Sequence, residues 1–237
     1  MNTKIPKHLS LDHASGLHEN EVIAQYELGS GKNFVYLILD WATKKAAIVD
    51  PQKDLSGILA DLKKYDFELT MVLLTHTHFD HIAGLIPLLK LFPDLIVRVG
   101  KADLHRLSED ALEASGLKIN TDGEKFNLGD LKLGATHTPG HSSGEFCYFL
   151  ETPESENIPY LFTGDTIFIR DCGRTDFEDG SNEEMFRSIQ RIKKFPPETV
   201  LLVGHHYAKE CSTTLAAELT ESGPFLVKTV DELTALP

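Results

Sequence analysis

The chain has 237 residues, of which 41% are hydrophobic, and it carries a formal net charge of -13 at pH 7. This length and composition provide enough apolar side chains for a sizeable core in one domain. The acidic balance argues against nucleic acid and anionic membrane surfaces as partners, because their phosphate groups would repel the chain.

The compartment is indicated by the cysteines and by the absence of long apolar segments. Cys147, Cys172 and Cys211 are odd in number and form no CxxC pair, which argues against a disulfide framework and for a reducing environment. Residues 1–20 are polar and lack the apolar segment of a secretory signal. The longest apolar runs, such as 34–39, are too short to span a bilayer. We therefore expect a cytoplasmic protein.

The first half of the chain alternates between strand and helix patterns. Short segments rich in β-branched and aromatic residues predict strands at 21–28, 33–40, 46–51, 69–75 and 95–100. The tetrapeptide GSGK at 29–32 indicates a hairpin turn between the first two. Apolar residues at helical spacing predict helices at 54–67, 82–92 and 101–115, the last closed by Gly116.

The second half repeats this style. Strands are predicted at 131–139, 145–151, 160–165 and 199–205, and helices at 182–195, 212–222 and 229–236. Asn182 is the expected N-cap of the first of these helices. Strands and helices in both halves predict an α/β fold in which two packed sheets carry helices on their outer faces.

Polar clusters follow several predicted strands, where α/β proteins place their ligands. The sequence THTHFDH is followed by TPGH, TGD and GHHY, and together they contain His76, His78, Asp80, His81, His141, Asp165 and His205. Imidazole and carboxylate are natural ligands of Zn²⁺, Fe²⁺ and Mn²⁺. Five histidines and two aspartates suit two metal ions that share one carboxylate. A single histidine is usually a satisfied polar group, which is the interpretation of His8, His13, His18 and His105. His137, one turn before TPGH, is expected to be buried or to support the site, and of the neighbours His205 and His206 only one can easily face it, so His137 and His206 are not expected to be ligands.

These four motifs, in this order and over about residues 20–210, resemble those of the metallo-β-lactamase superfamily. The resemblance implies a four-layer αββα sandwich of two mixed sheets with a metal site at their edge. It implies that His76, His78 and His141 hold one metal ion, that Asp80, His81 and His205 hold a second, and that Asp165 bridges them. Zinc is the expected metal, with iron or manganese as alternatives.

The implied reaction is hydrolysis. Water held between the metals is acidified to hydroxide and attacks an acyl carbon, while Asp80 orients the nucleophile and shuttles a proton. The segment 164–186 resembles the corresponding region of glyoxalase II, the hydroxyacylglutathione hydrolases, and that of the persulfide dioxygenases. Arg174 and Tyr207 match substrate-binding positions of glyoxalase II, whereas Thr175 and Asp176 match the dioxygenase version of the segment.

Two functions therefore remain open. The first is a thioesterase that hydrolyses a glutathione-type thioester with two metals. The second is a persulfide dioxygenase that oxidises glutathione persulfide with one Fe(II), held by His76, His141 and Asp165. A diiron redox module, an RNA-processing relative and an exported β-lactamase are disfavoured, because the chain shows no flavodoxin-like extension, no basic tract and no export signal.

We expect a single domain over 1–237, with a core at about 20–210, a short helical tail and no glyoxalase II C-terminal domain. The expected partner is a small thiol-derived molecule, and the sequence leaves monomer and dimer open. Cys172, next to the arginine of CGR, is interpreted as a small residue that shapes its loop rather than as a nucleophile.

Overall fold

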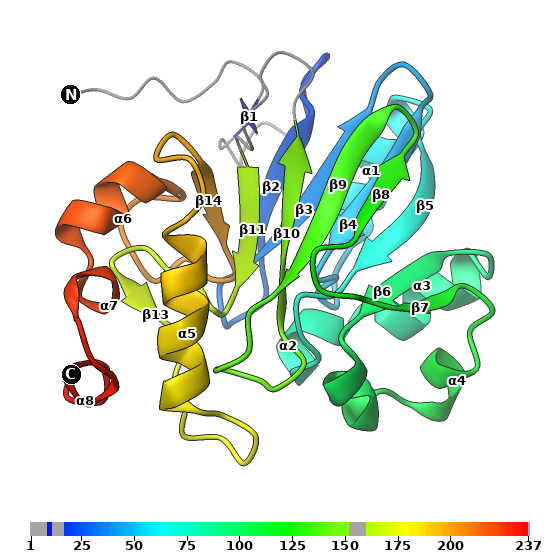
Figure 1. The fold of residues 1–237 in the computed structure, drawn as a ribbon. Coiled ribbons are helices and arrows are strands. Elements are labelled where there is room, and N and C mark those ends of the chain that lie inside the picture. Colours follow the sequence, from blue (N-terminus) through cyan, green and yellow to red (C-terminus); the bar gives the residue numbers. More distant parts are fainter. Residues whose placement is uncertain (1–8, 11–16, 152–159, 237) are drawn as a thin grey trace.

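Two sheets stack face to face and helices cover their outer surfaces (Figure 1). The computed structural model describes residues 9–10, 17–151 and 160–236. In this part of the chain, the first sheet has the order β1-β2-β3-β4-β5-β6-β7 and the second β15-β14-β11-β10-β9-β8. The fold predicted from the sequence, an αββα sandwich of two mixed sheets, is confirmed.

The first sheet is antiparallel at β2–β3–β4 and parallel from β4 to β7. Its strands are β1 (Leu9–Ser10), β2 (Ile23–Leu28), β3 (Asn33–Asp40), β4 (Lys45–Val49), β5 (Glu68–Leu73), β6 (Ile96–Val99) and β7 (Leu117–Ile119). Helices α1 (Ser56–Lys64) and α3 (Leu85–Leu91) contribute to the core on its outer face. The turn predicted at 29–32 joins β2 to β3, which pair from Ile23 with Ile38 to Leu28 with Asn33.

The second sheet is built from antiparallel neighbours except for the parallel pair β11–β14. Its strands are β8 (Lys125–Leu128), β9 (Leu131–His137), β10 (Phe146–Glu151), β11 (Tyr160–Gly164), β14 (Val200–Val203) and β15 (Thr213–Thr214). A separate small hairpin pairs β12 (Ile167–Phe168) with β13 (Asp171–Cys172). The outer face of the second sheet is covered by α5 (Asn182–Ile192), α6 (Leu215–Glu221), α7 (Gly223–Leu226) and α8 (Val230–Thr234).

The central strands are buried on both faces, which explains their continuous apolar runs. On β3, Phe34 and Tyr36 point into the core between the sheets, while Val35 and Leu37 join the core under the helices. This alternation follows from the two-residue period of a strand. None of the helices in the described part of the chain has the length and apolar character that a membrane crossing requires.

Two of the local predictions show how tertiary contacts override a sequence pattern. The helix expected at 101–115 is a 3₁₀ helix (Lys101–Arg106) followed by α4 (Glu109–Leu112). The chain is extended at Ser108, which acts as the N-cap of α4, and the buried carboxylate of Asp103 binds the amides of Thr77 and Gly144. These bonds fix the first turn against the neighbouring loops, so a continuous helix does not form.

The second error concerns the start of α5. Ser181, and not Asn182, is the N-cap, and its side chain accepts a hydrogen bond from the Glu184 amide. The Asn182 side chain instead accepts a hydrogen bond from the Thr175 hydroxyl. It therefore ties the helix to the CGRTDF loop.

Candidate metal centre

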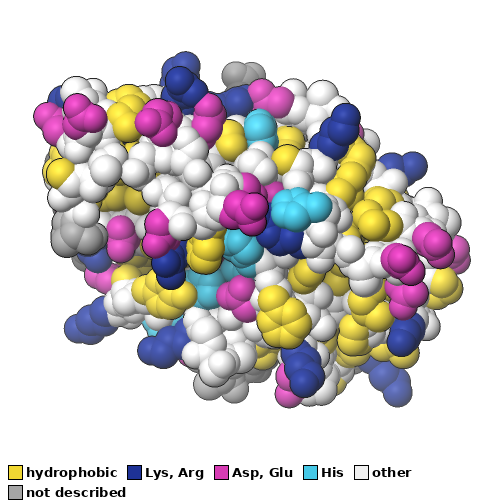
Figure 2. All heavy atoms as spheres, turned by 90° about the horizontal axis from the view of Figure 1, so that it is seen from below, with side chains coloured by type: hydrophobic (Ala, Val, Ile, Leu, Met, Phe, Trp, Pro, Cys, Tyr) yellow, Lys and Arg dark blue, Asp and Glu magenta, His cyan; other side chains and the backbone are white. Residues whose placement is uncertain are grey.

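The predicted ligand residues converge at one edge of the sandwich, beside the short helix α2 (Phe79–Ile82). They lie in loops that follow strands of both sheets, namely His76 and His78 after β5, His141 after β9, Asp165 after β11 and His205 after β14. Figure 2 shows this face of the molecule, where histidine side chains gather near the centre with acidic and apolar side chains beside them. Residues up to 129 positions apart in the sequence thus meet at one place, as His76 and His205 show.

One group consists of His76, His78 and His141, whose candidate ligand atoms all lie within 4.8 Å of one another. The Nδ1 atom of His78 lies 2.9 Å from Nε2 of His141. Phe177 contacts both of these imidazoles, with ring centroids 4.8 Å and 5.4 Å away. The aromatic ring therefore forms one wall of this group.

The second group consists of Asp80, His81 and His205, again within 4.8 Å of one another. The Nε2 atoms of the two histidines are 3.1 Å apart. The Oδ2 atom of Asp80 lies 3.6 Å from His81 Nε2 and 3.4 Å from His205 Nε2. Asp80 and His81 share the first turn of α2, which brings both side chains to the same centre.

Asp165 lies between the two groups. Its Oδ2 atom is 3.5 Å from His141 Nε2 and 3.4 Å from His205 Nε2, and its Oδ1 atom is 3.4 Å from His81 Nε2. Burial alone would raise the pKa of this carboxyl, but the surrounding histidines hold it well below its usual range. Asp165 is therefore an anion placed to contact both groups.

The outward-facing histidine nitrogens are held by oxygen atoms. His141 Nδ1 donates to the Arg174 carbonyl at 2.8 Å, and His205 Nδ1 donates to the Gly31 carbonyl at 2.8 Å. His81 Nδ1 contacts the Asp50 carboxylate at 3.0 Å. These bonds fix the ring orientations and direct each Nε2 atom toward the centre, the arrangement that metal-binding histidines require.

The buried polar atoms at the centre fit metal ions. His76 Nε2 and Asp165 Oδ1 are fully buried and have no hydrogen-bond partner among the described residues, an arrangement that is costly without a compensating contact. Burial, reinforced by His141, lowers the pKa of His78 to about 4, and the pKa of His76 is also well below its usual value. Both imidazoles are therefore neutral near pH 7, as metal ligation demands.

Asp50 and Glu145 are among the residues of this site that the sequence did not reveal. Asp50 accepts hydrogen bonds from the Thr75 amide and hydroxyl as well as from His81. Glu145 is completely buried and accepts a hydrogen bond from the Asp165 amide at 2.8 Å. Asp50 directly follows a strand and Glu145 directly precedes one, but neither lies in a histidine-rich motif that would have drawn attention to it.

The other residues considered from the sequence lie around this centre. Arg174 makes a two-fold ion pair with Asp176, at 2.6 Å and 2.7 Å, and both side chains are exposed. The exposed ring of Tyr207 stacks on His205 with an interplanar angle of 9°. Burial, with Asp171 nearby, raises the pKa of the Cys172 thiol to about 12, so the thiol is protonated at neutral pH.

His137 and His206, which were among the histidines not expected to be ligands, point elsewhere. His137 contacts the Ser143 carbonyl at 3.0 Å, and His206 contacts the Glu27 carboxylate at 2.5 Å. Neither belongs to a group of potential metal ligands in the described residues.

Comparison with known proteins identifies the family. The sequence model of the metallo-beta-lactamase superfamily matches residues 28–205. The chain belongs to this superfamily. It is accordingly an enzyme of a group whose members include proteins named as zinc-dependent hydrolases.

Several relatives are similar over most of this metallo-β-lactamase-fold chain. It is 36% identical over 177 residues to the cytoplasmic hydroxyacylglutathione hydrolase of Arabidopsis thaliana, covering 74% of this chain but 64% of that protein. It is 32% identical to the probable polyketide biosynthesis zinc-dependent hydrolase BaeB of Bacillus velezensis, covering 84% and 83% of the two chains. The crystal structure of ETHE1 from Myxococcus xanthus superposes with a TM-score of 0.76 at 27% identity, covering 91% and 92%.

Proposed function

We propose that the protein is a metal-dependent thioesterase of the glyoxalase II type, which hydrolyses a glutathione-type thioester. The observation that carries this proposal is the pair of adjacent ligand groups with the Asp165 carboxylate between them. Such a donor set suits two divalent ions, and we assign His76, His78 and His141 to one, Asp80, His81 and His205 to the other, and Asp165 to both. Zinc is the metal we expect, with iron and manganese as alternatives.

Divalent ions held in this way lower the pKa of bound water and polarise a carbonyl group. The protein's own contribution is positioning. The Asp80 side chain is 41% exposed, whereas those of His81 and His205 are 1% and 3% exposed. Asp80 is thus the member of its group that substrate and water can reach, and we assign it the orientation of the nucleophile and the transfer of its proton.

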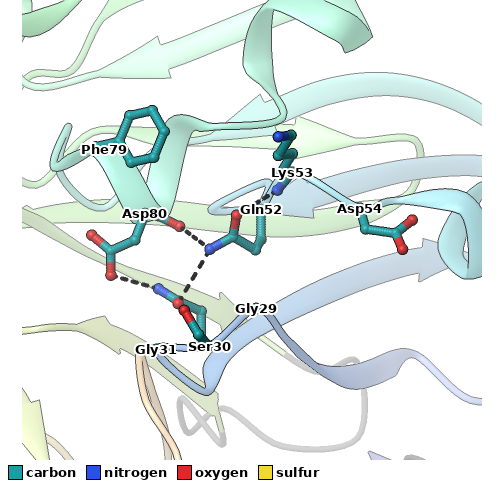
Figure 3. A pocket seen from close by; sticks show the side chains of 9 residues that line it. Gly29, Ser30, Gly31, Gln52, Lys53, Asp54, Phe79 and Asp80 are labelled. Atoms are coloured by element: carbon teal, nitrogen blue, oxygen red, sulfur yellow. Dashed lines mark hydrogen bonds between the residues drawn. The ribbon is translucent and has the colours of Figure 1, made fainter.

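Room for a substrate adjoins Asp80. A pocket of about 690 Å³ lies between the β2–β3 turn, the loop at 52–54 and Phe79, and Figure 3 shows Asp80 in its wall. The rings of Phe79, Phe177 and Tyr207 are all exposed, and Phe177 and Tyr207 contact ligand histidines. We assign Arg174 and Tyr207 to the binding of the thiol portion. The similarity to a cytoplasmic hydroxyacylglutathione hydrolase supports this substrate class and a cytoplasmic location.

The persulfide dioxygenase is the second candidate. It is favoured by Thr175 and Asp176 in the CGRTDF segment, which resembles the dioxygenase version. The similarity to ETHE1, which extends over 92% of that chain, is compatible with it. This reaction would use one iron, held by His76, His141 and Asp165.

The two functions respond differently to the loss of His78. We expect the wild-type protein to hydrolyse S-lactoylglutathione without oxygen uptake. His78→Ala should lose bound metal and at least about 100-fold in turnover, because it removes a ligand. His105→Ala, a histidine on the 3₁₀ helix that contacts the Ala102 carbonyl, serves as the matched control. Oxygen uptake with glutathione persulfide that survives in His78→Ala would instead support the dioxygenase, whose ligand set does not include His78.

A further inference from the structure

Two buried carboxamide side chains lie between the β2–β3 turn and Asp80. Asn33, the first residue of β3, donates from Nδ2 to the Oδ2 atom of Asp80 at 2.8 Å. Gln52 donates from Nε2 to Asn33 Oδ1 at 3.3 Å and to the Asp80 backbone carbonyl at 3.1 Å. Figure 3 shows the bond from Gln52 to the Asp80 backbone carbonyl in the wall of the pocket. The two amides therefore form hydrogen bonds with both the carboxylate and the backbone of Asp80.

We propose that Asn33 and Gln52 are positioning residues that hold the Asp80 carboxylate in its ligand group. This proposal deepens the function proposed above and rests on the assignment of two metal sites. Asn33 is 1% exposed and Gln52 is 9% exposed, so neither is free to exchange these bonds for bonds with water. Asp80, by contrast, is the solvent-accessible member of its group and sits on a helix of four residues. It is the ligand that most needs a fixed orientation.

The hydrogen-bond pattern determines which way each amide faces. Gln52 Oε1 accepts the Lys53 amide at 2.6 Å, so Gln52 Nε2 is the donor toward Asn33. Asn33 Oδ1 is thereby the acceptor, and its Nδ2 must face Asp80. A donor so placed stabilises the ionised carboxylate, which is the form that binds a metal ion.

The turn between β2 and β3 is shaped to admit these side chains. A Cβ atom at Gly29 would lie 2.9 Å from Gln52 Nε2, and a Cβ atom at Gly31 would lie 2.8 Å from Asn33 Oδ1. A Cβ atom at either position would therefore force the neighbouring amide to shift. The same turn binds His205 through the Gly31 carbonyl. The GSG turn at 29–31 thus contacts two members of one ligand group. It binds His205 directly and packs against the amides that bind Asp80.

The positioning acts on one ligand group only. The side-chain hydrogen bonds of Asn33 and Gln52 reach Asp80, and Asn33 also lies 3.5 Å from His81 Nε2. No such bond joins either amide to His76, His78 or His141 within the described residues. Loss of the amide pair should therefore weaken the second metal site and leave the first unchanged. A general loss of stability would affect both.

The test is a Co²⁺ titration of the metal-free full-length protein, followed by the visible absorption of the bound ion. Asn33→Leu keeps the approximate size of the side chain and removes both polar atoms. We expect its first binding step to match that of the wild type and its second to weaken about 10- to 100-fold, the usual cost of losing a residue that orients a metal ligand. Asn120→Leu is the matched control, because Asn120 is a buried amide that binds the Tyr148 hydroxyl.

Gln52→Leu provides a second variant in case Asn33→Leu fails to fold, and it should weaken the same step to a smaller extent. Two steps that both match the wild type in a folded variant would overturn the proposal. Two steps weakened equally would also overturn it, because they would show a structural role. A wild-type protein that binds only one ion would contradict the two-site assignment itself, and this result is distinct from the other two.

Discussion

The loop that carries Cys172, Gly173 and Arg174 is packed directly against the candidate ligands, and Gly173→Ala tests how closely the centre depends on it. A Cβ atom at Gly173 would lie 2.0 Å from the Asp165 backbone oxygen and 3.0 Å from His141 Nδ1. A Cβ atom essentially never lies closer than 3.0 Å to a non-bonded heavy atom. The loop must therefore retreat by about 1 Å, or Asp165 must move by the same amount.

This displacement would disturb the hydrogen bond from His141 to the Arg174 carbonyl, which is 2.8 Å long. Misplacement of about 1 Å at a reacting centre can reduce turnover by about 100-fold, and overpacking costs about 1–3 kcal/mol of stability. We expect Gly173→Ala to remain folded and to lose about two orders of magnitude in kcat/KM for S-lactoylglutathione. Thermal unfolding and metal content should be measured on the same sample.

Gly57→Ala is the matched control. Gly57 lies in α1, and a Cβ atom there would meet no atom within 4 Å. This substitution should leave activity unchanged and stabilise the helix by about 0.5–1 kcal/mol. If Gly173→Ala retained wild-type kcat/KM and metal content, the close packing of the loop on the centre would have no functional consequence and the reasoning would be refuted.

Three other substitutions test separate parts of the account. Arg174→Ala should raise KM for S-lactoylglutathione more than it lowers kcat, because we assign Arg174 to substrate binding rather than to chemistry. An unchanged KM in steady-state assays would show that Arg174 serves only in its ion pair with Asp176. Cys172→Ser should keep kcat within about threefold, since a thiol with its pKa raised to about 12 is a poor nucleophile at pH 7, and a complete loss of turnover would contradict this. Asp40→Asn should destabilise the protein by about 1–2 kcal/mol at pH 7, because Asp40 accepts hydrogen bonds from Thr43 and the Asp130 amide. These bonds lower the pKa of Asp40 despite its burial. The contribution of Asp40 to the free energy of unfolding is therefore present above its unfolded-state pKa and is lost as the pH falls through its folded-state pKa. If urea unfolding showed the same stability difference between wild type and Asp40→Asn at pH 7 and at pH 3, this explanation would be disproved.

The sequence predicts the sandwich well because its central strands are buried on both faces. A continuous apolar run such as 33–40 can bury its side chains in few ways other than as a central strand. The turn residues between such runs determine which strands can pair. The break at Ser108 was not predictable from periodicity, because it depends on bonds from Asp103 to residues 26 and 41 positions away. The start of α5 was missed for a similar reason, since Asn182 is engaged by Thr175.

The candidate ligands could be named from the sequence because they cluster in short motifs behind strands. Their supporting residues could not, because Asp50, Glu145 and Asn33 act through contacts that only the packed sheets create. Asn33 is the instructive case. The sequence predicts only that Asn33 is the polar first residue of a strand. Its role depends on a hydrogen bond to Asp80, which lies 47 residues further along the chain.

We propose that the two ligand groups bind two metal ions for thioester hydrolysis. Elemental analysis of the purified protein tests it most directly when the same sample is assayed with S-lactoylglutathione and, in an oxygen electrode, with glutathione persulfide. We expect about two metal ions per chain, together with hydrolysis and no oxygen uptake. About one iron per chain with oxygen uptake and no hydrolysis would contradict it and establish the dioxygenase in its place.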